Sequence, residues 1–116
     1  MRGWDAVIDW YKTVEKERGT DDIAKRAGCM VQVLSLLRTA LEAQLVDATP
    51  RLDMFTTELR ISNLYHVSIV CINGEDGILR VALVKNYREV IEQTEVSLSD
   101  VVNQIMAYLE RSTQID

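Results

Sequence analysis

The chain has 116 residues, of which 47% are hydrophobic and 27% are charged, and its formal net charge is −5 at pH 7. This length suits one domain with its own core, and the hydrophobic content excludes an intrinsically disordered chain. The acidic excess argues against nucleic-acid binding, which depends on basic residues that displace phosphate counterions. We therefore expect a single domain over residues 1–116 that binds no nucleic acid.

The sequence carries no targeting or membrane signal. No segment approaches the roughly 18 uncharged apolar residues that a bilayer span needs, and the first residues lead straight into charged helical sequence without a signal peptide. The two cysteines, Cys29 and Cys71, lie far apart inside apolar runs, which indicates buried free thiols rather than a disulfide scaffold. The sequence therefore predicts a cytoplasmic protein without membrane contact.

Two helices are predicted at the N-terminal end. Apolar residues recur at three- and four-residue steps from Trp4 to Val14, and Gly19 can end this first helix in a left-handed conformation. A second apolar stripe predicts a helix over about Asp22–Val46, with Thr20 as its N-cap.

The predicted second helix is long for a domain of this size. A helix of about 25 residues would span roughly 37 Å, whereas a compact chain of this length has a radius of gyration of about 13 Å. Glycine is unfavourable inside a helix, so the helix either breaks at Gly28 or continues through it. In the continuous form its excess apolar surface needs another contact, such as a second copy of the chain.

Period-two patterns predict strands in the middle of the chain. Residues 55–61 alternate as a half-buried strand, and residues 64–72 form a second strand rich in Val and Ile. The glycine-containing loop 73–77 joins this strand to a third one over residues 78–84. Residues 87–96 fit a helix or an edge strand, and we favour a fourth strand.

A C-terminal helix is predicted after Ser97, which forms a capping box with Asp100. The order of elements predicts an α+β fold with two N-terminal helices, a three- to four-stranded antiparallel meander and a C-terminal helix. All helices are expected on one face of the sheet. The opposite face or an open edge then needs covering, which again indicates self-association.

Few residues suggest catalytic chemistry. His66 is the only histidine, which excludes a two-histidine metal site within one chain. Five residues along a strand put it about 16 Å from Cys71, too far for a thiol–imidazole pair. The sequence offers several carboxylates for acid–base catalysis, and none of them stands out: Glu58, Glu75, Asp76, Glu89, Glu92 and Glu95. We expect no cofactor and no metal, and lean towards a protein that is not an enzyme.

Four side chains are candidate binding residues: Trp10, Tyr65, His66 and Tyr87. Trp10 borders the apolar stripe of the first helix, where a tryptophan serves either the core or a partner. The two tyrosines, with Met30 and Met106, suit an apolar pocket between the second helix and the sheet. The same four side chains also suit the core.

The leading hypothesis is a non-enzymatic interaction domain that forms a homodimer and binds a protein partner. It rests on the long second helix, the uncovered sheet edge and the lack of a catalytic constellation. The alternative is a domain that binds a small apolar ligand in the pocket beneath the second helix. An enzyme that uses carboxylates with His66 comes third, and an acidic inhibitor that mimics nucleic acid comes fourth.

Overall fold

The computed structural model describes residues 3–44, 48–53 and 55–115. Its elements in chain order are α1 (Trp4–Arg18), α2 (Asp22–Ala43), β1 (Thr49–Asp53), β2 (Thr56–Arg60), β3 (Tyr65–Asn73), β4 (Ile78–Lys85), β5 (Glu89–Ser97) and α3 (Val101–Ile115). The strands form one antiparallel sheet in the order β1-β2-β3-β4-β5, so each strand pairs with its neighbour in sequence. The predicted α+β meander is confirmed, with five strands instead of three to four.

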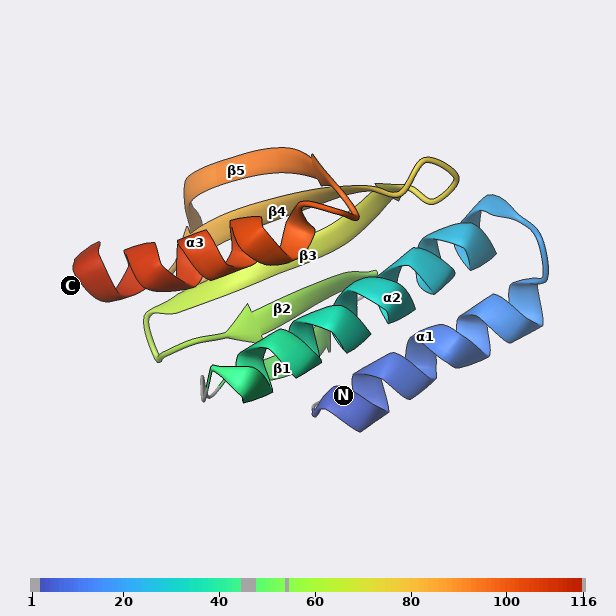
Figure 1. Cartoon of the computed structure of the whole chain (residues 1–116), viewed down its shortest axis with the longest axis horizontal. Helices are drawn as coiled ribbons and strands as arrows, with labels where there is room; N and C mark the ends of the chain where they lie inside the picture. The colour runs from blue at the N-terminus through green and yellow to red at the C-terminus, as the bar shows by residue number, and fades with distance from the viewer. Residues whose placement is uncertain (1–2, 45–47, 54, 116) are drawn as a thin grey trace.

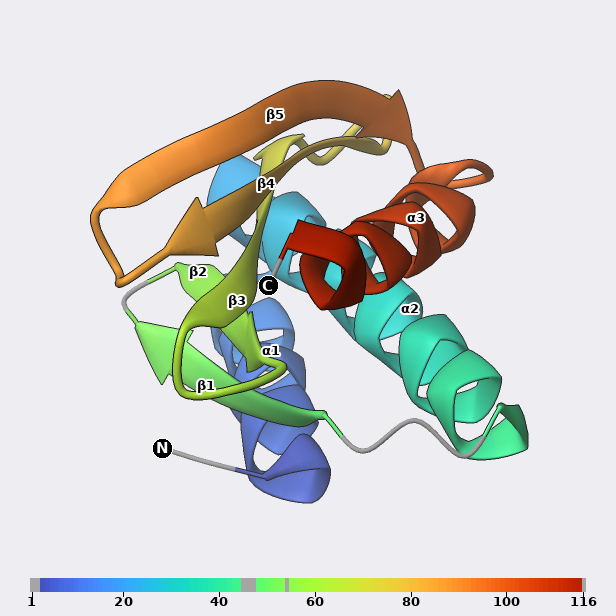
Figure 2. The same ribbon diagram turned by 90° about the vertical axis from the view of Figure 1, so that its left-hand side faces the viewer.

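The three described helices cover one face of the sheet (Figures 1 and 2). α1 and α2 lie side by side, α2 packs on β3, and α3 packs on β3 and β4. The core fills the space between these helices and the sheet. No helix in the described part of the chain covers the opposite side of the sheet, which we call the open face (Figure 2).

α2 is continuous over Asp22–Ala43, so it does not break at Gly28. The predicted end of this helix, Val46, lies outside the described residues. Most of its apolar side chains are buried against α1, α3 and the sheet. Leu36 is a large apolar residue of α2 that stays outside the core, with 52% of its surface exposed. The length of α2 is therefore accommodated within the chain.

The caps of two helices differ in detail from the prediction. Asp21, not Thr20, is the N-cap of α2, because its carboxylate accepts a hydrogen bond from the Ala24 N–H at 2.8 Å. Before α3, the Ser97 hydroxyl donates to the Asp100 carboxylate at 3.2 Å. Ser97 and Asp100, the predicted capping-box partners, thus bind each other through their side chains just before α3 begins.

β1 (Thr49–Asp53) was not predicted from the sequence. It contains Pro50, which lacks an N–H and is tolerated only at a sheet edge. Here Pro50 pairs with Leu59 of β2, and its carbonyl accepts a hydrogen bond from the Gly3 N–H at 3.1 Å. A short strand with a proline has no clear period, so only its pairing with β2 reveals it.

β5 confirms the preference for a fourth predicted strand over a helix. In a helix, its glutamates would line one face. In the strand, Glu92 forms an ion pair with Arg111 of α3, and Glu95 lies opposite Arg80 of β4. Opposite charges across neighbouring strands stabilise a sheet, so the basic partners favour the strand.

Two glycines lie at close contacts between elements. A Cβ at Gly74 would lie 2.5 Å from backbone atoms of Lys25 and Arg26, so the β3–β4 loop packs directly on the start of α2. A Cβ at Gly28 would meet only the side chain of Glu15, whose carboxylate end can rotate away.

Replacing Gly74 with alanine is expected to lower the free energy of unfolding by about 1–3 kcal/mol, because the loop and α2 must move apart. Gly28→Ala is the matched control. It should keep or raise stability, because alanine favours a helix interior over glycine by about 1 kcal/mol. Urea denaturation of both variants measures the difference, and an undiminished stability of Gly74→Ala would contradict the close packing.

Candidate functional site

The centre of the open face carries small and apolar residues around one charged side chain, Arg80. Alternate residues of a strand point to opposite faces, so the residues between the core positions of β3 and β4 lie on the open face. Ala82 and Val84 lie there outside the core cluster, and yet each is only 7% exposed. No described helix covers them, so the longer side chains around them supply the shielding. The centre consists of Ser68, Val70, Ile72, Ile78, Ala82 and Val84.

Charged residues border this centre on both sides. Towards β1, Arg51 lies opposite Glu58. Arg60 lies two residues further along β2, on the same face. On β4 itself, Arg80 lies between Val70 of β3 and Glu95 of β5. An apolar centre with a polar rim is the usual anatomy of a protein interface.

His66 and Tyr87 meet on the open face. Their rings are stacked, with centroids 4.9 Å apart and planes inclined by 27°. His66 is 6% exposed and Tyr87 is 52% exposed, so the tyrosine ring covers the imidazole and faces solvent itself. Burial lowers the pKa of His66 below its usual 6.5, which favours the neutral imidazole.

Tyr87 occupies a strained turn between β4 and β5. Asn86 and Tyr87 have φ angles of 56° and 61°, and the Arg88 N–H donates to the Lys85 carbonyl at 3.2 Å. Such a type I′ turn normally places glycine second, because a left-handed side-chain residue costs about 1–2 kcal/mol. The stack on His66 offsets part of this cost and fixes an exposed aromatic ring at the rim of the face.

The other two predicted binding residues lie elsewhere. Trp10 packs edge-on against Tyr11 and Phe55, with centroid distances of 5.1 and 5.5 Å, at the border of the core. Tyr65 is buried on the helix-covered side of the sheet, because it precedes His66 in the same strand. Of the four candidates, the fold therefore brings together only His66 and Tyr87.

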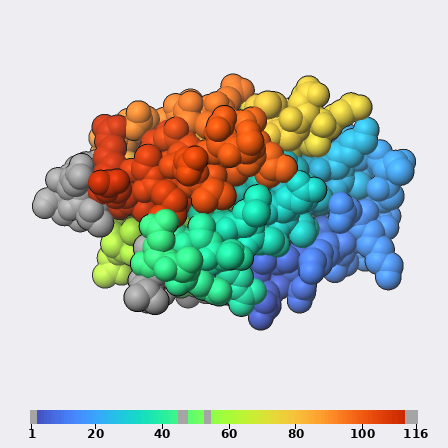
Figure 3. Space-filling model, in the orientation of Figure 1, coloured from blue at the N-terminus to red at the C-terminus, as the bar shows by residue number. Residues whose placement is uncertain are grey.

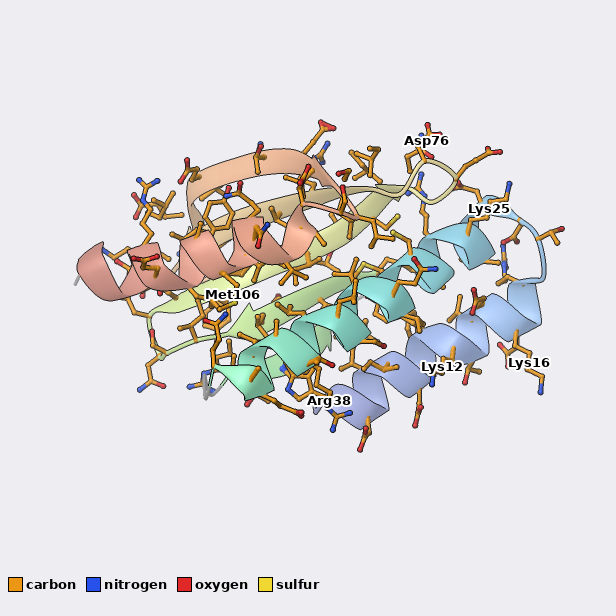
Figure 4. The ribbon with its side chains drawn as sticks, viewed as in Figure 1. Lys12, Lys16, Lys25, Arg38, Asp76 and Met106 are labelled. Atoms are coloured by element: carbon orange, nitrogen blue, oxygen red, sulfur yellow. The ribbon has the colours of Figure 1, made fainter. Side chains whose placement is uncertain are left out.

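The residues proposed for an apolar pocket do not share one cavity. Met30 is fully buried in the core, and Tyr87 lies on the open face. Met106 instead lines a surface groove of about 530 Å³ beside α3, near the end of α2. Figure 4 labels Met106 on α3, and Figure 3 shows the surface formed by the helices.

Two of the candidate carboxylates lie away from His66. The imidazole of His66 stacks on the ring of Tyr87, and burial lowers its pKa. Glu75 lies 3.9 Å from Lys25 at the β3–β4 loop, and Glu92 pairs with Arg111 on the other side of the sheet. Within residues 3–44, 48–53 and 55–115, no three His, Cys, Asp or Glu side chains gather as a metal site.

Comparisons with known proteins leave the family open. No family model matches the chain, and neither a curated protein nor a solved structure shows significant similarity to it. Among the described helices, none combines the length and the apolar character that crossing a membrane requires. The inference of function therefore rests on the geometry of the open face.

His66 is expected to titrate below pH 6.5, and NMR can follow it alone because the chain has one histidine. The unfolded imidazole binds a proton more readily than the buried one, so the free energy of unfolding should fall as the pH drops through 6.5 towards the folded-state pKa. His66→Gln should remove this part of the pH dependence. Tyr87→Gly should raise the pKa towards 6.5 by uncovering the ring, whereas a wild-type midpoint at or above 6.5 would contradict the burial.

Proposed function

We propose that the chain is a non-enzymatic interaction domain that forms a homodimer by packing the open faces of two sheets together. The observation that carries this proposal is the apolar centre with a charged rim on the face that the described helices leave uncovered. Two sheets that pack face to face interdigitate their side chains at a separation of about 10 Å. The small residues Ser68 and Ala82 would allow such an approach.

The size of the open face suits a dimer. Five strands of up to nine residues, spaced about 4.8 Å apart, cover about 600 Å² in projection. Two copies would bury about 1,200 Å², which is the lower end of stable interfaces. Tyr87 and Val90, each 52% exposed, stand at the rim and would lose exposed apolar surface in the complex.

The distribution of charge favours a second copy as the occupant. A two-fold axis parallel to the strands would place the β1–β2 side of one copy over the β5 side of the other. Arg51 of one copy would then lie over Gln93 of its partner, two residues along β5 from Glu95. Arg60 would instead lie over the row that holds Val90. An axis perpendicular to the strands would instead bring the arginines of the two copies together. The parallel axis therefore brings charges of opposite sign closer together, whereas the perpendicular axis brings like charges together.

A dimer of this kind would keep the helix layer of both copies accessible (Figure 3). This layer includes Leu36, the exposed leucine of α2, and therefore offers a surface for the protein partner expected from the sequence. The two free thiols fit the expected cytoplasmic location.

Light scattering coupled to size exclusion tests the dimer. The wild type should have a mass about twice 13.2 kDa, whereas Val70→Lys should give about 13.2 kDa at the same concentration. A lysine at this position is solvated in the monomer but would be buried without a partner charge in the interface. Leu36→Lys is the matched control on the helix layer and should keep the dimer mass.

A wild-type protein that stays monomeric at all concentrations up to about 100 μM would refute the proposal. Its Kd for dimerisation would then be weaker than about 100 μM. So would a Val70→Lys variant that remains dimeric. Circular dichroism of both lysine variants separates loss of the dimer from loss of the fold.

The groove beside α3 supports a second candidate function, the binding of a small apolar molecule. Its volume of about 530 Å³ suits a small ligand, and its apolar lining comes from Ile61, Met106, Ala107 and Leu109. Anilinonaphthalene sulfonate is a suitable fluorescent probe. Ala107→Trp should fill the groove and reduce the bound fluorescence several-fold, while Leu36→Lys, which lies outside the groove, should leave it unchanged. Equal fluorescence of Ala107→Trp and wild type would exclude the groove.

A further inference from the structure

Two cysteines that are distant in sequence form a pair in the core. Cys29 belongs to α2 and Cys71 to β3, two elements that pack against each other. Both side chains lie in the same core cluster, and each thiol shifts the pKa of the other, which indicates that the two groups are neighbours. Both are free thiols, as expected from the sequence, but their pairing results from the packing of α2 on the sheet.

One of the two sulfurs borders solvent. Cys29 is 6% exposed and lines a surface hollow of about 410 Å³ between α1, α2 and the β3–β4 loop. Cys71 lies behind it and is 1% exposed. Lys25 and Asp76 also line this hollow, at the end of the molecule where Figure 4 labels them. A small solute can therefore approach Cys29 from the side of this hollow.

The two thiols of the pair have different surroundings. The interaction with Cys29 lowers the pKa of Cys71, together with the Asn73 backbone N–H and the positive charge of Arg26, against the opposing effects of burial and Asp22. The same interaction and burial raise the pKa of Cys29. Cys71 therefore has the lower pKa, whereas Cys29 is the residue that borders the hollow.

We propose that Cys29 and Cys71 are a peroxide-sensitive dithiol, which closes to an intramolecular disulfide between α2 and β3. One sulfur of the pair attacks one oxygen of hydrogen peroxide as its thiolate, the O–O bond breaks, and the departing hydroxide takes a proton to become water. The other sulfur then attacks the resulting sulfenic acid, the S–O bond breaks, and a second water leaves. Two thiols are oxidised to one disulfide while one peroxide is reduced to two waters.

The disulfide would tie α2 to the centre of the sheet. A cross-link between positions this far apart restricts the unfolded chain, and the melting temperature should rise by about 10 °C. Exchange with a small thiol reverses the bond. In a reducing compartment such disulfides are transient and report on oxidants, which fits a sensor rather than a structural staple.

Peroxide treatment of the intact chain tests the proposal. The mass should fall by about 2 Da as two hydrogens are lost. Trypsin should then yield residues 27–38 joined to residues 61–80, because these are the fragments that contain the two cysteines. Dithiothreitol should separate the fragments, and the melting temperature should return to that of the untreated protein.

Cys29→Ser is the control that removes the second sulfur but keeps a hydrogen-bond donor next to Cys71. This variant should gain about 16 Da or more at Cys71 instead of losing 2 Da. Three wild-type results would overturn the proposal: an oxygen adduct without loss of hydrogen, a disulfide between two chains, or two intact thiols after millimolar peroxide. The wild-type result decides the matter even if the variant fails to fold.

Discussion

The packing of every described helix on one face of a single sheet sets the rest of this structure. β3 and β4 consequently have two different environments, because their alternate residues point either into the core or onto the open face. Val67 and Leu83 are fully buried beneath the helices, whereas Ser68 and Ala82 occupy the centre of the uncovered side. The small size of the outward residues makes that side flat enough to approach another sheet. The same asymmetry that builds the core therefore creates the candidate interface.

The two ways in which a sheet can associate are not equally available here. The free edge formed by β5 carries three glutamates and a bulge, features that discourage pairing with another strand. Basic neighbours balance these glutamates from within the chain, as Lys85 does opposite Glu89. The open face carries fewer charges at its centre, where Ser68 lies opposite Ala82 and Val70 lies opposite Arg80. Association through the face is therefore favoured over association through the edge.

β3 links the two inferences of function. Cys71 points towards α2 and carries the redox proposal, while Val70 points outward and carries the dimer proposal. Because adjacent residues face opposite sides of the sheet, each proposal can be tested by substitutions that leave the other site in place. His66 and Tyr87 mark the rim of the open face, where a strained turn holds an aromatic ring in solvent. Backbone strain at an exposed side chain is more common at functional sites than in ordinary hairpins.

The sequence by itself determined the helices, four of the five strands and the α+β class, because period, capping residues and turn residues act over a few neighbouring positions. It also identified His66 and Tyr87 as binding candidates, although only as separate residues. β1 escaped prediction because a short edge strand with Pro50 exists only through its pairing with β2. The His66–Tyr87 stack and the pairing of Cys29 with Cys71 were likewise decided by the tertiary structure. Such contacts depend on strand register and helix packing, which join residues that no local pattern relates.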